Sequence, residues 1–383
     1  MYDLHLAYQE TAHLHELLAE WDAGVVAEGP IVRNRWADIA LWPAARSGTI
    51  AGSTGIEGNP LTASQVDEVL AGGPVAARPT DVREVLNYNA ALDLANRAAL
   101  RTDFEWTQEL LRRLNATAMQ GLEDDERGEY RHQAVNVGGV FSPPDYSRVP
   151  SLMSRLVEWL RGEDCGHPII RGGLTHLNVV SIHPWLNGNG RTARVAGSLM
   201  LMRCGIGAPE LLNVESAIRA SAERYAYVLQ ATHGSTYDPE RHSATEWLEY
   251  FAGICVSQLE ARNRLNAAVR NDVGLLAQEL HGAQMSPDWP FILLGASLAP
   301  VRTARLAESL GLSAVRVRAI LQSMVAAGWL VAEGDNRARR YAAGSRLRGL
   351  PLRTPELMYR LRNEAAPSVQ APGPGEAEGD RRQ

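Results

Sequence analysis

The chain has 383 residues, of which 45% are hydrophobic and 21% charged, and its formal net charge at pH 7 is -6. These values are typical of a soluble globular protein of two or three domains, and they exclude a basic nucleic-acid coat protein. No apolar run approaches the roughly 20 residues that span a membrane, and the first ten residues lack a signal-peptide pattern. We therefore expect a cytoplasmic protein with no membrane partner.

All the basic side chains are arginine, because the sequence contains no lysine. This excludes enzymes that need a lysine in a phosphate loop, on the nucleotide-binding strand of a kinase, or as a Schiff base. Any phosphate chemistry must therefore use arginine and backbone amides. The cysteines are too scattered for a zinc site or a disulfide framework; they are Cys165, Cys204 and Cys255.

The N-terminal residues 1–46 are predicted to be helical, because an apolar face recurs at Leu14, Leu17, Leu18 and Trp21. Residues 47–62 are small, polar and rich in glycine around one acid, Glu57. Since Asn59-Pro60 closes this segment, its composition predicts a loop.

Amphipathic periodicity predicts further helices over residues 81–99, 107–122 and 149–161, the second of them capped near Thr107. Between the last two, residues 130–141 mix aromatic and β-branched side chains around Gly138-Gly139. This pattern predicts a short β-hairpin or flap, and an irregular surface loop is the alternative.

The stretch HPWLNGNGRTAR, from His183 to Arg194, lies between two segments with helical apolar spacing. A glycine-rich loop that opens a helix exposes backbone N–H groups to an anion. Arg191 and Arg194 are one turn apart and offer guanidinium forks that suit phosphate. His183 titrates near neutrality and can act as a base. The alternative is a simple loop with a core histidine and two surface arginines.

This stretch resembles the signature of the Fic family, HPFx[DE]GNGRxxR. Fic proteins typically transfer AMP from ATP to a protein hydroxyl. The resemblance implies a mainly α fold, a Fic-type helical bundle with a short β-hairpin flap. It also implies that His183 deprotonates a Ser, Thr or Tyr of the target. By the same resemblance, the nucleotide would be bound by Gly188, Asn189, Gly190, Arg191 and Arg194.

Two positions depart from the family pattern. Trp185 replaces phenylalanine, and both are apolar anchors. Asn187 replaces the acid that normally holds Mg²⁺, and an amide oxygen without charge should bind this ion more weakly. ATP and Mg²⁺ are therefore expected, and a different nucleotide or another phosphate-containing donor is the alternative.

The resemblance also gives the glycine-rich segment a second interpretation. Many Fic proteins carry an inhibitory helix with the pattern [ST]xxxE[GN], and Ser53 to Gly58 fits it. The resemblance implies that Glu57 pairs with Arg194. A carboxylate in the fork of that arginine would deny it to the terminal phosphate of ATP.

The flap and a later helix complete what the resemblance implies. The flap would dock the backbone of the target, or of the chain itself, by strand addition; its residues are Val135, Asn136, Val137 and Gly138. Helices are predicted over residues 213–232 and 246–266. In the first, Tyr225 and Tyr227 would flank adenine, and core packing of both tyrosines is the alternative.

From about residue 290 the sequence predicts a helix, a tight turn at Gly311, a helix capped by Ser313, and a small hairpin turning at residues 334–336. This pattern resembles a winged helix-turn-helix. DNA is then a predicted partner, and a protein-interaction or dimerisation module, and so a homodimer, is the alternative. A local positive excess comes from Arg302, Arg305, Arg316, Arg318, Arg337, Arg339 and Arg340.

We therefore predict four regions. Residues 1–95 are an N-terminal helical region with the inhibitory motif, and residues 96–275 are the Fic core with its closing helices. Residues 276–345 are the winged helix-turn-helix, and residues 346–383 are a C-terminal segment whose tail from Glu364 is disordered. The predicted function is a protein adenylyltransferase held off by Glu57. A DNA-binding regulator that senses nucleotide is the alternative from another class.

Overall fold

The computed structural model describes residues 3–32, 35–122, 127–162, 166–280, 286–335 and 339–363. Over these residues the fold is mainly α, and the two named strands form one small antiparallel sheet. The predicted fold class is therefore confirmed as mainly helical. No helix in the described ranges is both long and apolar enough to cross a membrane.

The N-terminal region begins with five helices, namely α1 (Ala12–Glu28), α2 (Arg35–Ala40), α3 (Trp42–Ile56), α4 (Ala63–Leu70) and α5 (Pro79–Ala99). The prediction of helix throughout residues 1–46 is wrong for residues 3–11 and 29–32. Gly29 ends α1 with a φ of +80°, a conformation that favours glycine, and Pro30 follows it.

The loop prediction for residues 47–62 is wrong for its first ten positions, which form the last ten of the fifteen residues of α3. The glycines serve close helix packing against α10 (Val214–Ala220). A Cβ on Gly52 would lie 2.5 Å from the backbone of Glu215. Ser216 also donates to the carbonyl of Gly48 at 2.9 Å. A composition rich in glycine was therefore a sign of close contact between helices, as well as of a turn.

The central helices are α6 (Gln108–Ala118), α7 (Val149–Arg161), α8 (Pro168–Ile182) and α9 (Asn189–Arg203), with 3₁₀ turns η1 (Tyr146–Arg148) and η2 (Pro209–Leu212). Thr107 caps α6 by accepting from the amide of Leu110, as predicted. Helices α8 and α9 pack directly on one another. A Cβ on Gly172 of α8 would lie 2.7 Å from Leu201 of α9, so this glycine sets how closely the pair approaches.

The predicted hairpin near residues 130–141 is much smaller than expected. A single antiparallel bridge pairs Val137 with Phe141 around the turn at Gly138 and Gly139. Ser142 then bridges in parallel to Thr236. The segment is therefore a tight turn fixed at its base, because too few residues alternate to sustain two strands.

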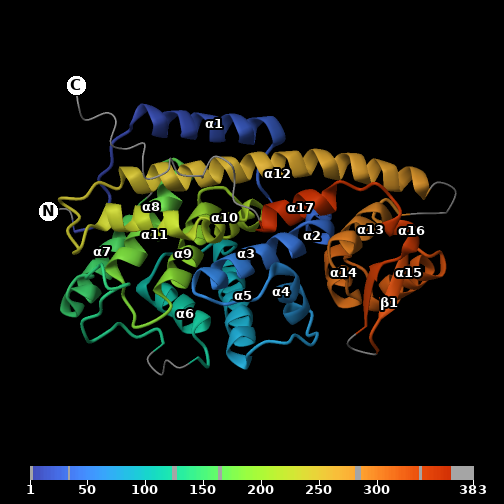
Figure 1. The fold of residues 1–383 in the computed structure, drawn as a ribbon, viewed down its shortest axis with the longest axis horizontal. Helices are drawn as coiled ribbons and strands as arrows, with labels where there is room; N and C mark the ends of the chain where they lie inside the picture. The colour runs from blue at the N-terminus through green and yellow to red at the C-terminus, as the bar shows by residue number, and fades with distance from the viewer. Residues whose placement is uncertain are drawn as a thin grey trace.

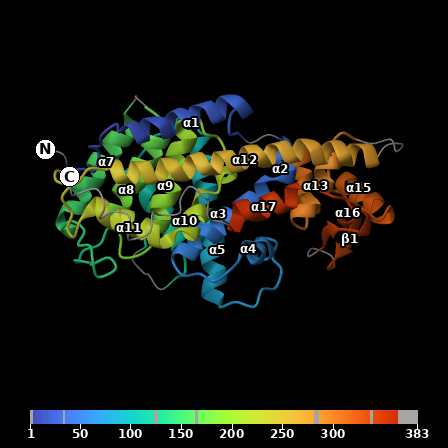
Figure 2. The same cartoon turned by 45° about the horizontal axis from the view of Figure 1, so that its top comes forward.

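The predicted helix over residues 213–232 is broken at Ser221 into α10 and α11 (Ala222–His233). Helix α12 (Thr245–Glu279) is longer than predicted. Figures 1 and 2 show α1 lying along α12 in both views, while α12 runs the length of the molecule from the central helices to the C-terminal elements.

The C-terminal elements are α13 (Trp289–Leu298), α14 (Thr303–Leu310), α15 (Ala314–Ala326), β1 (Leu330–Glu333), β2 (Arg340–Ala343), α16 (Ser345–Arg348) and α17 (Thr354–Asn363). The predicted turn at Gly311 has a φ of +63°, and the Ser313 side chain caps α15. The strands pair from Leu330 with Ala343 to Glu333 with Arg340. Asn336 of the predicted turn, Arg337 of the predicted positive cluster, Cys165, and the tail from Glu364 lie outside the described residues.

Candidate functional site

The imidazole of His183 stands at the end of α8, where the backbone turns into the left-handed region with φ 51° and ψ 61°. Its Nδ1 lies 3.3 Å from the carbonyl of Val180. Because a carbonyl only accepts, Nδ1 carries the proton and Nε2 is left with a lone pair. Burial lowers the pKa of His183 to about 4. The hydrogen bond to Val180 opposes this effect but is weaker than burial. The ring is therefore neutral at pH 7 and can accept a proton.

The loop after His183 is closed by a buried amide. The Asn189 side chain accepts from the Trp185 amide at 3.0 Å and donates to the Trp185 carbonyl at 2.8 Å. Asn115 of α6 donates to the carbonyl of Asn187 at 3.0 Å. Gly188 takes a φ of +76°. The Asn189 side chain is thus committed to the shape of the loop, and this residue offers a ligand only its backbone amide.

Helix α9 presents its first amides to the space beside this loop. The first bond back into the loop runs from the Thr192 amide to the Gly188 carbonyl at 2.9 Å. The amides of Asn189, Gly190 and Arg191 precede it, and such amides have no intrahelical acceptor. A helix N-terminus of this kind carries partial positive charge and favours an anion.

The structure places a carboxylate at this helix N-terminus. A Cβ on Gly190 would lie 2.5 Å from Oε1 of Glu57, so only glycine leaves room for the acid. The same Oε1 accepts from Nη2 of Arg194 at 2.7 Å. Glu57 follows the last residue of α3, and α3 therefore carries its acid across to α9.

Arg194 is buried, and three of its contacts come from α3 and the residue after it. Nε donates to the Ser53 hydroxyl at 2.7 Å and Nη2 to the Ser53 carbonyl at 3.1 Å, besides Glu57. Its Nη1 has no hydrogen-bond partner in the part of the chain that the structure describes. Burial lowers the pKa of Arg194, but Glu57, Tyr225 and Tyr88 together outweigh burial and the net pKa is raised. The arginine stays charged.

Glu57 is ionised in this arrangement. Burial raises the pKa of its carboxyl, but Arg194, Arg191 and His183 outweigh that effect and the net pKa lies below its ordinary value. The side chain is 32% exposed, so solvent screens part of this attraction. The carboxylate thus occupies, as a charged group, the place where an anion would bind at α9.

Arg191 faces a second acid that the sequence did not single out. Nη1 of Arg191 lies 3.4 Å from Oε1 of Glu84 on α5. The other oxygen of Glu84 accepts from the Asn59 amide at 2.8 Å. Glu84 therefore joins Arg191 to the turn that follows Glu57. Each signature arginine has its own carboxylate, and no motif marks Glu84 within its helix.

A buried arginine, Arg131, ties the flap to the signature loop and was also missed. Its Nε donates to the His183 carbonyl at 2.8 Å, and its amide donates to the Pro184 carbonyl at 2.8 Å. It also donates to the carbonyls of Gln133 and Pro144. A lone arginine in a loop carries no sequence signal for this role, which depends on four backbone carbonyls brought together by the fold.

Arg131 links the flap to the signature loop, and of the four flap residues Asn136 and Gly138 are exposed while Val135 and Val137 are half-buried. The amide of Val137 donates to the Phe141 carbonyl at 2.8 Å. Val135 and Asn136 make no backbone hydrogen bond to another described residue. Gly138, at the tip, has a φ of +60°. The backbone before the turn is therefore open to pairing with another extended segment.

The two tyrosines of α11 lie in different surroundings. Tyr225 is buried and its hydroxyl lies 3.0 Å from Nε2 of His176, whereas Tyr227 is 60% exposed. Residues two apart on a helix point to different sides. The two side chains therefore do not share one face of α11, and Tyr225 packs in the core.

The predicted metal position at Asn187 provides few protein ligands for a metal ion. Asn187 is exposed at the loop, and among the described residues no group of three or more His, Cys, Asp or Glu is arranged to hold a metal ion. One neutral amide oxygen is a weak ligand for a hard divalent cation. A cation at this site would therefore depend mainly on oxygens that a bound substrate supplies.

Part of the chain is similar to known proteins of one family. Residues 105–201 match the model of the Fic/DOC family. The chain is 35% identical over 157 residues to the protein adenylyltransferase Fic of Drosophila erecta, covering 40% of this chain and 31% of that relative. The corresponding protein of Drosophila grimshawi is also 35% identical, over 157 residues and 32% of its length. The chain thus spans about a third of these curated relatives.

Solved structures share the fold. A Fic family protein from Desulfovibrio desulfuricans G20 has a TM-score of 0.59 at 24% identity, over 88% of this chain and 98% of that one. Fic-1 of C. elegans has a TM-score of 0.54 at 22% identity, over 66% of this chain and 72% of that one. The similarity in fold extends beyond the segment that the family model matches.

Proposed function

We propose that this chain, which carries a Fic/DOC family domain over residues 105–201, transfers AMP from ATP to a Ser, Thr or Tyr hydroxyl of a protein. The observation that carries the proposal is that a neutral imidazole, His183, lies beside the N-terminus of α9 and two arginines. A base and an anion site side by side are what this transfer needs.

In the proposed reaction, Nε2 of His183 takes the proton of the target hydroxyl. The hydroxyl oxygen forms a bond to the α-phosphorus of ATP, and the bond from that phosphorus to the bridging oxygen of pyrophosphate breaks. AMP remains on the target as a phosphodiester, and pyrophosphate leaves with the bond electrons. The backbone amides of Gly188, which precedes α9, and of Asn189 and Gly190, which begin it, would face the phosphate charge.

Arg191 and Arg194 hold the remaining phosphates in this proposal, and Glu57 holds the enzyme off. The support is the 2.7 Å contact between Glu57 and Arg194, with the carboxylate against Gly190. The terminal phosphate of ATP and this carboxylate would compete for one guanidinium. The N-terminal helices thus act on the signature through α3.

The target would dock on the flap. This target is another protein or a segment of the chain itself that carries a hydroxyl. The support is the open backbone of Val135 and Asn136 and the attachment of the flap to the His183 carbonyl through Arg131. Backbone pairing would place a hydroxyl near the imidazole and read little of the target sequence.

An assay with two labels tests the proposed chemistry. ATP labelled at the α-phosphate should transfer label to protein, whereas ATP labelled at the γ-phosphate should not. Label from the γ-position would show phosphate transfer, and label only from another nucleotide would show a different donor. Either result would replace AMP transfer with one of those alternatives.

Mg²⁺ is expected to accompany the nucleotide, with Asn187 as the nearest candidate ligand from the loop. Asn187→Asp should tighten Mg²⁺ binding in the presence of ATP on the order of tenfold, because a charged oxygen replaces a neutral one. The concentration of Mg²⁺ at half-maximal rate measures this. An unchanged value would mean that residue 187 does not face the metal. Asn271→Asp, at an exposed position of α12 away from the site, controls for added charge.

Glu84 is expected to restrain Arg191. In a variant that lacks Glu57, Glu84→Gln should lower the KM for ATP by about twofold to fivefold, because a partly exposed pair at 3.4 Å contributes at most about 1 kcal/mol. The amide keeps the hydrogen bond from Asn59. Arg191→Ala should remove the gain. If KM rises in Glu84→Gln, the acid holds Arg191 in its productive position instead.

DNA binding by the C-terminal elements is a second candidate function, favoured by the exposed face of α15. That face carries arginine and polar side chains beside an apolar one, at Val315, Arg316, Arg318 and Gln322. Helices of this composition enter the major groove in winged helix-turn-helix proteins. Arg318→Gln should weaken binding to the DNA upstream of its own gene about tenfold in a gel shift. Absence of any shift with the unaltered chain would exclude this function.

A further inference from the structure

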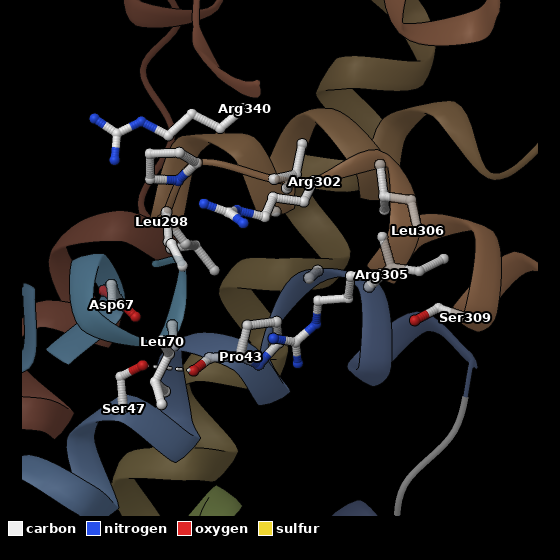
Figure 3. A pocket seen from close by; sticks show the side chains of 18 of the residues that line it. Pro43, Ser47, Asp67, Leu70, Leu298, Arg302, Arg305, Leu306, Ser309 and Arg340 are labelled. Carbon is white, nitrogen blue, oxygen red and sulfur yellow. Dashed lines mark hydrogen bonds between the residues drawn. The ribbon is translucent and has the colours of Figure 1, made fainter. Parts of the chain in front are cut away.

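A cavity of about 220 Å³ lies where the N-terminal helices meet the C-terminal elements. One wall comes from α2, α3 and α4, and the other from α13, α14 and the start of β2. Figure 3 shows the side chains that line it, with Ser47 and Pro43 of α3 across from Arg302 and Leu306. None of these residues belongs to the site around His183.

Arg302, in the wall of this cavity, indicates what the cavity could bind. It precedes α14, and its guanidinium extends into the cavity in Figure 3. Its Nε is buried and has no hydrogen-bond partner among the residues that the structure describes. A buried donor with no acceptor is costly, and such groups usually face a water or a ligand that completes them.

The other charges of the cavity show why an anion fits beside Arg302. Asp67 pairs with Arg362 at 2.7 Å, and Glu68 pairs with Arg340. These two acids are therefore occupied by their own arginines. The third acid of the wall, Asp38, also interacts with another residue of the chain, so none of the three carboxylates is free.

Arg305 adds a second positive group on the same side. It lies one turn after Arg302, and its guanidinium stacks 5.1 Å from the ring of Trp42. Figure 3 shows it reaching toward Pro43. Two guanidinium groups from the start of α14 thus enter one cavity, together with the partial positive charge of that helix N-terminus.

We propose that this cavity binds a small metabolite that carries a phosphate or carboxylate group, with its oxyanion on Arg302 and Arg305. The rest of the ligand lies against the apolar part of the wall, at Pro43, Leu70 and Leu298. The volume is below the roughly 300–1,000 Å³ of common ligand pockets. The ligand is therefore smaller than a whole nucleotide.

A ligand in this cavity would lie between the N-terminal helices and the C-terminal elements. It would touch α3, which Glu57 directly follows, and α14, which is the first helix of the predicted helix-turn-helix. Binding here is independent of AMP transfer, because it uses none of the residues around His183. Its test therefore measures binding alone.

Isothermal titration of the full chain with inorganic phosphate, and separately with acetate, tests the site. We expect saturable binding that Arg302→Gln weakens about tenfold or more, since a charge-assisted pair is lost. Arg302→Lys should weaken it less. Arg348→Gln, at an exposed arginine outside the cavity, should bind like the unaltered chain. Tighter binding of phosphate would assign a phosphate ester as the natural ligand, and tighter binding of acetate a carboxylate.

Equal binding by the unaltered chain and Arg302→Gln would overturn the proposal, and so would no binding of either anion. A phosphate signal that survives in Arg302→Gln but disappears in Arg194→Gln would place the anion at α9 and also overturn it. The unfolding temperature of each variant without ligand, together with Arg302→Lys, separates loss of binding from loss of folding.

Discussion

Replacing His183 should lower AMP transfer by about a hundredfold to ten-thousandfold, the usual loss when a positioned base is removed. The neutral ring, with Nδ1 held by the Val180 carbonyl, leaves only Nε2 to accept the proton. Transfer is measured in a Glu57→Gly background, so that the rate before substitution is high. ATP binding and the unfolding temperature should change little.

The choice of replacement matters, because residue 183 has a φ of 51°. Asparagine adopts this left-handed conformation more readily than alanine. His183→Asn therefore keeps the loop shape, and His183→Ala serves as the second variant. His13→Ala, at an exposed histidine of α1, is the matched control and should be fully active. Full activity in His183→Asn would remove this imidazole from the mechanism.

Glu57→Gly should raise transfer by about tenfold or more, because it frees Arg194 and the N-terminus of α9 at once. A charge-assisted contact that ATP no longer has to displace contributes more than about 1.4 kcal/mol, which is a factor of ten. Glu57→Gln keeps the size of the side chain and loses its charge. Its transfer rate should lie between those of the unaltered chain and Glu57→Gly. Rates of AMP incorporation at fixed ATP measure the series.

The dependence on Arg194 separates release from loosening of the fold. If Glu57 acts by occupying the guanidinium, then Arg194→Ala should be inactive with or without Glu57. A gain that persists in the double variant Glu57→Gly, Arg194→Ala would mean that the substitution acts elsewhere. Circular dichroism of each variant checks that the buried position tolerates alanine.

Elements with strong local signals could be predicted from the sequence. The Thr107 hydroxyl capped α6, and Gly311 with the Ser313 hydroxyl formed the turn between α14 and α15, because these residues act on backbone within three positions of themselves. The signature loop was also predictable as a unit between α8 and α9. Its closure by the Asn189 side chain was not, since this depends on the exact turn that the loop adopts.

Features that depend on distant partners could not be predicted. The glycines of α3 looked like loop residues, because the helix α10 that needs them is far along the chain. Glu84 and Arg131 are ordinary residues in their own segments, and only the fold places them at Arg191 and at the His183 carbonyl. The pairing of Glu57 with Arg194 was implied by family resemblance and by no local property of either residue.

The most direct test of AMP transfer held off by Glu57 is intact-protein mass spectrometry after incubation with ATP and Mg²⁺. Three proteins are compared: the unaltered chain, Glu57→Gly, and Glu57→Gly with Arg194→Ala. The account predicts that only Glu57→Gly gains the mass of AMP, on a Ser, Thr or Tyr that peptide mapping then locates. Equal AMP addition to the unaltered chain and Glu57→Gly, or addition to the double variant, would contradict it.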